Sequence, residues 1–372
     1  MSQINIGVIG CGSIAQTGHL PWYWESSKSN LLAVCSDLED EVKSVAKRWQ
    51  VEKWFTDYQD LLAMDEIDAV SICTPVWLHQ EIAVAAAEAG KHILCEKPMA
   101  RNSEEAQLMV EAAKRNNVLL TVGFMKRFHP GFRRIKEIVD RGLIGRVYHI
   151  DVHWNLFFPS GTRESETFSE DKRIGGGVIL DNCSHYIDFS RWLLESEVAT
   201  IYSETAKVVP DRIYEDQATV ILRFQNQSTS IMDMGFNRVE WVERSAWDRR
   251  PEYSSHFTEQ GFIYGTEGTI TFEAPPFDSV ESLSIKVYLL KGEHCQLGGR
   301  HEIEVPVIRQ PGGPLTPYEI ESFPFKAQIE HFLDCIGGNA SLQVSGDDGL
   351  IVTEVSMAAY ESARTGQRIM LT

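Results

Sequence analysis

Short apolar runs recur through the first third of the chain, between Ile4 and Phe124, and amphipathic stretches separate them. The runs lack polar alternation, which is typical of strands that are covered on both faces in a parallel sheet. The stretches at 41–49, 77–89 and 104–116 have helical spacing, and Ser103 is the expected cap of the last one. The pattern predicts an α/β domain with a doubly wound parallel sheet of about six strands. The strand runs are INIGVIG, LLAVCSD, DAVSICTP, HILCEK and LLTVGF.

The pattern changes after Phe124. A connecting helix is followed by RVYHIDVHWNL, which alternates like a half-exposed strand, and then by strand runs with no regular helices between them. Such runs favour a large, mostly antiparallel, open sheet in an α+β domain. Segments 237–261 and 292–318 are predicted as loops or insertions. Because a single core rarely exceeds about 250–300 residues, we predict two domains, residues 1–124 and 125–372.

The composition narrows the classes of partner. Lys and Arg number 35 against 53 Asp and Glu, so the net charge is −18, which argues against nucleic-acid binding. No apolar stretch approaches the roughly 18 residues of a membrane span, and no basic region precedes the first apolar run, so we expect no membrane partner and no export signal. The seven cysteines are scattered without a CxxC pair. This predicts buried reduced thiols in a cytoplasmic protein, rather than disulfides or a zinc site.

A glycine-rich motif, GCGSIA, follows the first apolar strand directly. Gly10 allows a tight strand-to-helix turn, Gly12 lets backbone approach a pyrophosphate, and Ala15 permits close packing of the helix on the strand. The start of the next helix offers N–H groups and a positive dipole end to phosphates. The motif therefore predicts a dinucleotide site, with contacts from Gly10, Gly12, Ser13, Ile14 and Ala15.

Asp37 is the candidate acidic partner of the ribose. It ends the second apolar run, 27 positions after Gly10, whereas the usual offset is about 20. We attribute the excess to Pro21, which is expected to break the first helix and restart it. A carboxylate accepts hydrogen bonds from a ribose 2′-hydroxyl and repels a 2′-phosphate, so NAD is predicted over NADP. Two alternatives remain: Asp37 is a solvated strand-end acid or helix cap, or Lys43 or Arg48 folds back to tolerate NADP.

Five motifs in order, GCGSIA, CTPVWLH, CEKP, GFMKRFHP and GGGVILDNCSHYID, resemble the glucose-fructose oxidoreductase and inositol dehydrogenase family, Gfo/Idh/MocA. The resemblance implies an N-terminal Rossmann domain and a C-terminal domain whose open sheet often forms subunit contacts, and hence a homodimer or homotetramer. It also implies a dehydrogenase that moves hydride between C4 of nicotinamide and a carbinol carbon. Lys97 matches the family's EKP lysine, and Asp181 and His185 match its DxxxH motif.

The chemistry of alcohol oxidation supports these residue types, because a base must reach the hydroxyl proton as hydride leaves the same carbon. An imidazole, with an unperturbed pKa of about 6.5, exchanges protons near neutrality. Lys97 would share or relay that proton, and Asp181 would bind a substrate hydroxyl or orient His185. The alternatives are a surface lysine, a helix-capping aspartate and a histidine bonded to local backbone. No third ligand supports a metal at Asp181 and His185.

Strand-end positions in an open α/β sheet commonly face the ligand. On the nicotinamide side we expect Thr74, Pro75, His79, Glu96 and Lys97, with Arg127 of the interdomain crossover also meeting cofactor or substrate. The resemblance suggests that Pro98 is cis. The glycines at 175–177 are expected to let backbone pass close to a ligand or to act as a hinge.

The leading hypothesis is an NAD-dependent dehydrogenase that acts on a sugar, a cyclitol or a related polyol. The first alternative is a glycoside-cleaving enzyme of the same fold that retains NAD. The second is a non-catalytic dinucleotide sensor, against which the joint presence of Lys97, Asp181 and His185 counts.

Overall fold

The structure, a computed structural model, describes residues 3–156, 176–209, 212–236, 257–274, 283–290, 300–304 and 317–371. The chain divides into two compact units, which we call the first unit (1–128 with 321–354) and the second unit (129–320 with 355–372). The sequence pattern placed 321–354 in the second domain. These residues instead pack with the first unit, because Ile329 and Phe332 join the hydrophobic core that includes Ile6 and Val8.

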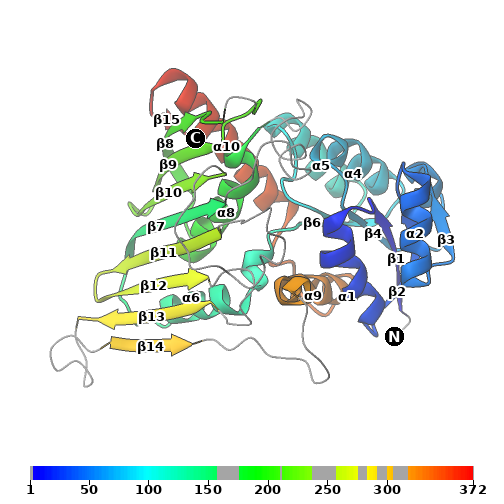
Figure 1. The fold of residues 1–372 in the computed structure, drawn as a ribbon, viewed down its shortest axis with the longest axis horizontal. Coiled ribbons are helices and arrows are strands. Elements are labelled where there is room, and N and C mark those ends of the chain that lie inside the picture. The colour runs from blue at the N-terminus through cyan, green and yellow to red at the C-terminus, as the bar shows by residue number, and fades with distance from the viewer. Residues whose placement is uncertain are drawn as a thin grey trace. The chain divides into compact units, whose positions relative to one another are not determined.

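A six-stranded parallel sheet forms the centre of the first unit, in the order β3-β2-β1-β4-β5-β6, as the doubly wound prediction requires (Figure 1). Its strands are β1 (Ile4–Ile9), β2 (Ser29–Cys35), β3 (Lys53–Phe55), β4 (Ala69–Ile72), β5 (His92–Cys95) and β6 (Leu120–Val122). The order reverses between β1 and β4, which is the position where open sheets of this type bind their ligands.

Helices alternate with these strands. The predicted break at Pro21 is confirmed: a π-helix at Ala15–His19 is followed by α1, whose second residue is this proline. The predicted cap Ser103 is wrong, because the side chain of Asn102 accepts the N–H of Glu105 at the start of α5. The helices are α1 (Leu20–Glu25), α2 (Glu39–Trp49), α3 (Tyr58–Leu62), η2 (Val76–Leu78), α4 (His79–Glu88), α5 (Ser103–Arg115), η3 (Met125–Phe128), α9 (Pro317–Ile336) and α10 (Gly346–Thr365).

The second unit contains a nine-stranded sheet in the order β14-β13-β12-β11-β7-β10-β9-β8-β15. Only the β10–β7 pair is parallel among these described strands, so the prediction of a mostly antiparallel sheet is confirmed. The strands are β7 (Val147–Leu156), β8 (Val198–Ala206), β9 (Gln217–Phe224), β10 (Thr229–Gly235), β11 (Phe257–Gly265), β12 (Gly268–Ala274), β13 (Ser284–Leu289), β14 (Arg300–Glu304) and β15 (Ile369–Met370).

The loop predictions for 237–261 and 292–318 are wrong where they overlap β11, β14 and the start of α9, and their other residues lie outside the described ranges.

Helices α6 (Pro130–Asp140) and α8 (Ser184–Leu194) pack on one face of this sheet (Figure 1). The Phe132 ring of α6 lies edge-on to Phe189 of α8 and to Phe272 of β12, with ring centroids 5.0 and 5.4 Å apart. The opposite face, which we call the outward face, carries side chains that are half-buried or exposed, such as Arg223 and Tyr264. One covered and one open face explain the polar alternation in the sequence.

Six of the seven cysteines lie in the described ranges, and all six are buried free thiols, as predicted; Cys295 lies outside those ranges. Burial raises the pKa of Cys11 and Cys35 to about 12. In the part of the chain that the structure describes, no helix has the length and apolar character to cross a membrane.

Candidate cofactor and catalytic site

The glycine-rich turn is built as the motif requires. Gly10 has a φ of +97°, and a Cβ there would lie 2.5 Å from the carbonyl oxygen of Cys73, so only glycine fits between β1 and β4. A Cβ on Gly12 would meet no atom within 4 Å. The helical turn begins at Ser13, beside this open space. A closed turn next to open space at a helix start fits the pyrophosphate of a dinucleotide.

Asp37 is the second residue after the end of β2 and is exposed. Strand β2 pairs with β1, so the carboxylate stands at the same sheet edge as the glycine-rich turn. A hydrogen bond from Ser36 Oγ to Glu41 Oε2, 2.8 Å long, holds the turn that leads into α2. The arrangement suits an acidic ribose contact.

The loop after β5 carries Glu96, Lys97 and Pro98. The Lys97–Pro98 peptide bond is cis, as the resemblance suggested. Glu96 is buried, and its Oε2 accepts the backbone N–H of Lys97 at 3.1 Å. A Cβ on Gly123, just after β6, would lie 2.7 Å from Glu96 Oε1, so the carboxylate sits closely against that glycine. Glu96, expected among the cofactor contacts, thus also supports the backbone of Lys97.

A buried histidine that the motif analysis missed completes this support. His19 ends the π-helix and is fully buried, and its Nε2 lies 2.9 Å from Glu96 Oε1. Its Nδ1 lies 3.1 Å from Ser71 Oγ, and the Tyr23 hydroxyl lies 2.8 Å from the same oxygen. No motif marks this histidine, because its partner Glu96 lies 77 positions away in the sequence.

His79 was expected on the nicotinamide side, and the structure places its ring inside the first unit. The ring nitrogens Nδ1 and Nε2 lie 2.9 Å from the Pro98 carbonyl oxygen and 2.8 Å from the Thr74 carbonyl oxygen. Burial lowers the pKa of His79, which outweighs the opposing effect of these carbonyls. The histidine therefore ties the loop after β4 to the loop that carries Lys97. The hydroxyl of Thr74 is buried without a hydrogen-bond partner among the described residues.

Arg127 is also enclosed within the first unit. Its guanidinium donates to the carbonyl oxygen of Gln343 at 2.6 Å and to Asp348 Oδ1 at 3.1 Å. These bonds fix η3 to the segment that follows α9 within the first unit. Arg127 thus has structural partners in Gln343 and Asp348. The cofactor contact that we expected for it stays a prediction.

Asp181 and His185 lie at the start of the predicted helix in the second unit. The helix opens as a π-helix, η6 (Ile179–Cys183), and continues as α8. Asp181 is half-buried and accepts a hydrogen bond from Asn182 Nδ2 at 2.9 Å, while His185 is 9% exposed. The structure thus groups Glu96 and Lys97 in the first unit, and Asp181 and His185 in the second.

Glu215 anchors the start of this helix, which the sequence did not indicate. Its Oε1 accepts the N–H groups of Gly177 and Ile179 at 3.2 and 3.1 Å and the Tyr360 hydroxyl at 2.7 Å. Burial raises the pKa of the Glu215 carboxyl. A Cβ on Gly177 would lie 2.0 Å from the Glu215 carbonyl oxygen, so this glycine serves close packing within the protein. Gly175, of the same predicted run, lies outside the described residues.

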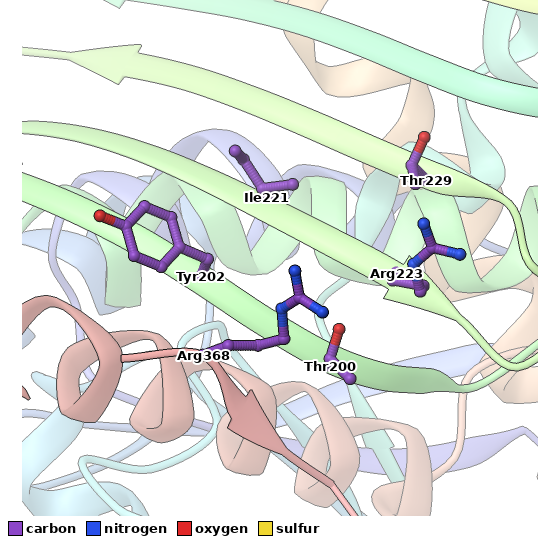
Figure 2. A pocket seen from close by; sticks show the side chains of 6 residues that line it. All are labelled: Thr200, Tyr202, Ile221, Arg223, Thr229 and Arg368. Carbon is purple, nitrogen blue, oxygen red and sulfur yellow. The ribbon is translucent and has the colours of Figure 1, made fainter. Parts of the chain in front are cut away.

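A separate pocket lies on the outward face of the second unit's sheet (Figure 2). Hydroxyl groups and two guanidinium groups surround it, and none of the predicted site residues contributes to it. Its lining residues are Thr200, Tyr202, Ile221, Arg223, Thr229 and Arg368.

Comparisons with known proteins agree with this division. Residues 4–124 match the family model "Oxidoreductase family, NAD-binding Rossmann fold", and residues 132–271 match "GFO/IDH/MocA C-terminal domain". The chain is 30% identical to myo-inositol 2-dehydrogenase of Thermotoga maritima, with 99% of this chain and 98% of that protein covered. It is 27% identical to levoglucosan dehydrogenase of Pseudarthrobacter phenanthrenivorans, with 98% and 97% covered.

The fold also matches solved structures over the whole chain. A levoglucosan dehydrogenase in complex with NADH and levoglucosan superposes with a TM-score of 0.83, at 23% identity and with 99% of both chains covered. At this identity the match shows the shared fold.

Proposed function

The chain belongs to the Gfo/Idh/MocA family of NAD-binding oxidoreductases, and from that premise we propose that it is an NAD-dependent dehydrogenase for a secondary alcohol of a sugar, a cyclitol or a related polyol. The observation that carries the proposal is the pairing of an open glycine-rich turn with a lysine on a strand-end loop of the same sheet. Relatives named for myo-inositol and levoglucosan support this substrate class.

In this proposal the first unit holds the cofactor. Gly12 and the helix start at Ser13 receive the pyrophosphate, and Asp37 accepts hydrogen bonds from the adenosine ribose. Bound NAD supplies a hydride acceptor at C4 of its nicotinamide. An exposed carboxylate at the ribose position favours NAD over NADP.

The proton of the substrate hydroxyl passes to side chains of this chain. We assign His185 as the base and Lys97 as the group that shares or relays the proton, and as a cation Lys97 stabilises a developing alkoxide in the reverse direction. Asp181 orients His185 or binds a neighbouring hydroxyl. Glu96 fixes the backbone at Lys97, and Glu215 fixes the helix start before Asp181.

The test is the absorbance of NADH formed by the purified protein with NAD and a panel of polyols that includes myo-inositol and levoglucosan. A dehydrogenase forms one NADH for each ketone produced. Release of reducing sugar from glycosides without net NADH would instead support the NAD-retaining glycoside-cleaving alternative. Dinucleotide binding with neither product would support a sensor and overturn the proposal.

We also propose that the outward face of the second unit's sheet forms the contact of a homodimer or homotetramer. Aromatic side chains lie on this face, where the rings of His149 and Tyr264 stack with centroids 5.7 Å apart. Light scattering after size exclusion tests it: Tyr264→Glu should reduce the mass from a multiple of 42.1 kDa toward one chain. A wild-type protein that is already monomeric would contradict this assignment.

A further inference from the structure

A chain of four buried polar side chains links the cofactor helix to the catalytic loop. The Tyr23 hydroxyl lies 2.8 Å from Ser71 Oγ, which lies 3.1 Å from His19 Nδ1. His19 Nε2 lies 2.9 Å from Glu96 Oε1, and Glu96 Oε2 accepts the backbone N–H of Lys97 at 3.1 Å. When Glu96 is ionised its oxygens only accept, and Nε2–H is then the donor in the bond to Glu96.

The chain joins segments that are distant in sequence. His19 ends the helix that begins at the glycine-rich turn, and Glu96 directly follows β5. His19 and Tyr23 are fully buried and Glu96 is nearly so. In such surroundings an unmade hydrogen bond leaves a buried polar group unsatisfied, so each group has a strongly preferred position. The Phe325 ring, 6.1 Å from that of His19, and Gly123 against Glu96 leave this pair little room to move.

We propose that His19 is a positioning residue for catalysis: by holding Glu96, it fixes the Lys97 backbone relative to the cofactor helix. The inference rests on the proposed function, because it assigns a purpose to the place of Lys97 in the hydride-transfer reaction. His19 acts through packing and through its hydrogen bond to Glu96. In this role it contacts neither substrate nor cofactor.

Two substitutions test the roles of the two ring nitrogens of His19 separately. Glutamine places its amide nitrogen near the position of Nε2, and asparagine places its amide nitrogen near that of Nδ1. His19→Gln therefore keeps a donor to Glu96, whereas His19→Asn keeps only the contact with Ser71. Tyr23→Phe is the matched control, because it removes a hydroxyl from the same buried chain while the His19–Glu96 bond remains.

The first readout is steady-state kinetics with NAD and the best polyol of the panel. We expect His19→Asn to lower kcat about 100-fold, the loss typical of a catalytic group displaced by about 1 Å, with KM for NAD nearly unchanged. His19→Gln and Tyr23→Phe should keep most of the turnover. Equal kcat values for the Asn and Gln variants would overturn the proposal.

The second readout does not need activity. Hydrogen–deuterium exchange of the peptide that contains Lys97 should be faster in His19→Asn than in wild type, and unchanged in His19→Gln. If His19→Asn fails to fold, Glu96→Asp replaces it, since the shorter side chain cannot reach both His19 and the Lys97 N–H. Unchanged exchange in that variant would overturn the proposal. A wild type that forms no NADH would instead defeat the proposed function, while the exchange result still decides the role of His19.

Discussion

The loop that carries Lys97 and the helix start that carries Asp181 and His185 are both held by a buried carboxylate, but the two carboxylates have different origins. Glu96 is the neighbour of Lys97 in sequence and binds its N–H directly. Glu215 comes from the turn before β9, and its partner Tyr360 lies 145 positions further on, in α10. The Lys97 N–H is thus held by its sequence neighbour, which in turn contacts His19, whereas the helix start before His185 is held by a carboxylate from a distant segment of the second unit.

Because of this difference, we expect substitutions at the two supports to have different effects on catalysis and on stability. Disturbing the bonds of Glu96 should change catalysis, because Lys97 follows it directly. Disturbing Glu215 should first cost folding free energy, because the polar groups that it satisfies come from two separate segments of the second unit.

The largest effects should come from the catalytic candidates themselves. We expect Lys97→Ala and His185→Ala each to lower kcat by about 10²–10⁴-fold, the range of a lost general acid or base. NAD binding, measured by isothermal titration, should be nearly unchanged because both groups act on the hydride-transfer step. Full activity in either variant would remove that residue from the mechanism.

Glu215 offers a matched pair of substitutions. Glu215→Ala leaves the N–H groups of Gly177 and Ile179 without their acceptor, so we expect a loss of about 2 kcal/mol in the free energy of unfolding. Glu215→Gln keeps an oxygen in the same place and should lose much less. Urea unfolding measures both. Equal losses would show that the carboxylate oxygen is not what holds this helix start.

Asp37 is a useful contrast, because it is exposed and has no comparable buried support. Replacing Asp37 with alanine should lower the preference for NAD over NADP by about tenfold. This factor corresponds to the loss of roughly 1.4 kcal/mol from one charged hydrogen bond. The kcat/KM values for both cofactors provide the measurement. An unchanged ratio would mean that another residue contacts the ribose.

The smallest expected effect is a pH dependence. Burial raises the folded-state pKa of Glu215 above its ordinary value of 4.5. At pH values between 4.5 and the raised pKa, the folded protein binds more protons at Glu215 than the unfolded chain does. The contribution of this carboxyl to stability therefore falls as the pH rises. Relative to wild type, Glu215→Gln should therefore gain stability from pH 4.5 upward. If the free energies of unfolding of wild type and Glu215→Gln changed equally with pH across this range, the assignment would be contradicted.

The sequence predicted the parts of the molecule whose causes are local. The apolar runs located five strands of the first sheet, and the glycine-rich motif located the turn that only Gly10 can form. Strand β3 was missed because its sequence, KWF, contains a lysine and its residues are not fully buried, so it forms no apolar run. Helix α9 was missed because Pro324 lies inside it, and its core contacts come from the other end of the chain.

The supporting residues were harder to predict than the site residues. His19 and Glu215 belong to no motif, and each acquires its meaning from partners far away in sequence. His79 differs from them, because its place in a motif suggested a cofactor contact and its ring nitrogens lie against the nearby backbone carbonyls of Thr74 and Pro98.

The central claim is that this chain transfers hydride directly from a carbinol carbon to nicotinamide. The most direct measurement uses a polyol deuterated at its carbinol carbons, with mass spectrometry of the cofactor after a single turnover. We expect one deuterium on the reduced nicotinamide for each ketone formed. Ketone formation with no deuterium on the nicotinamide would contradict it.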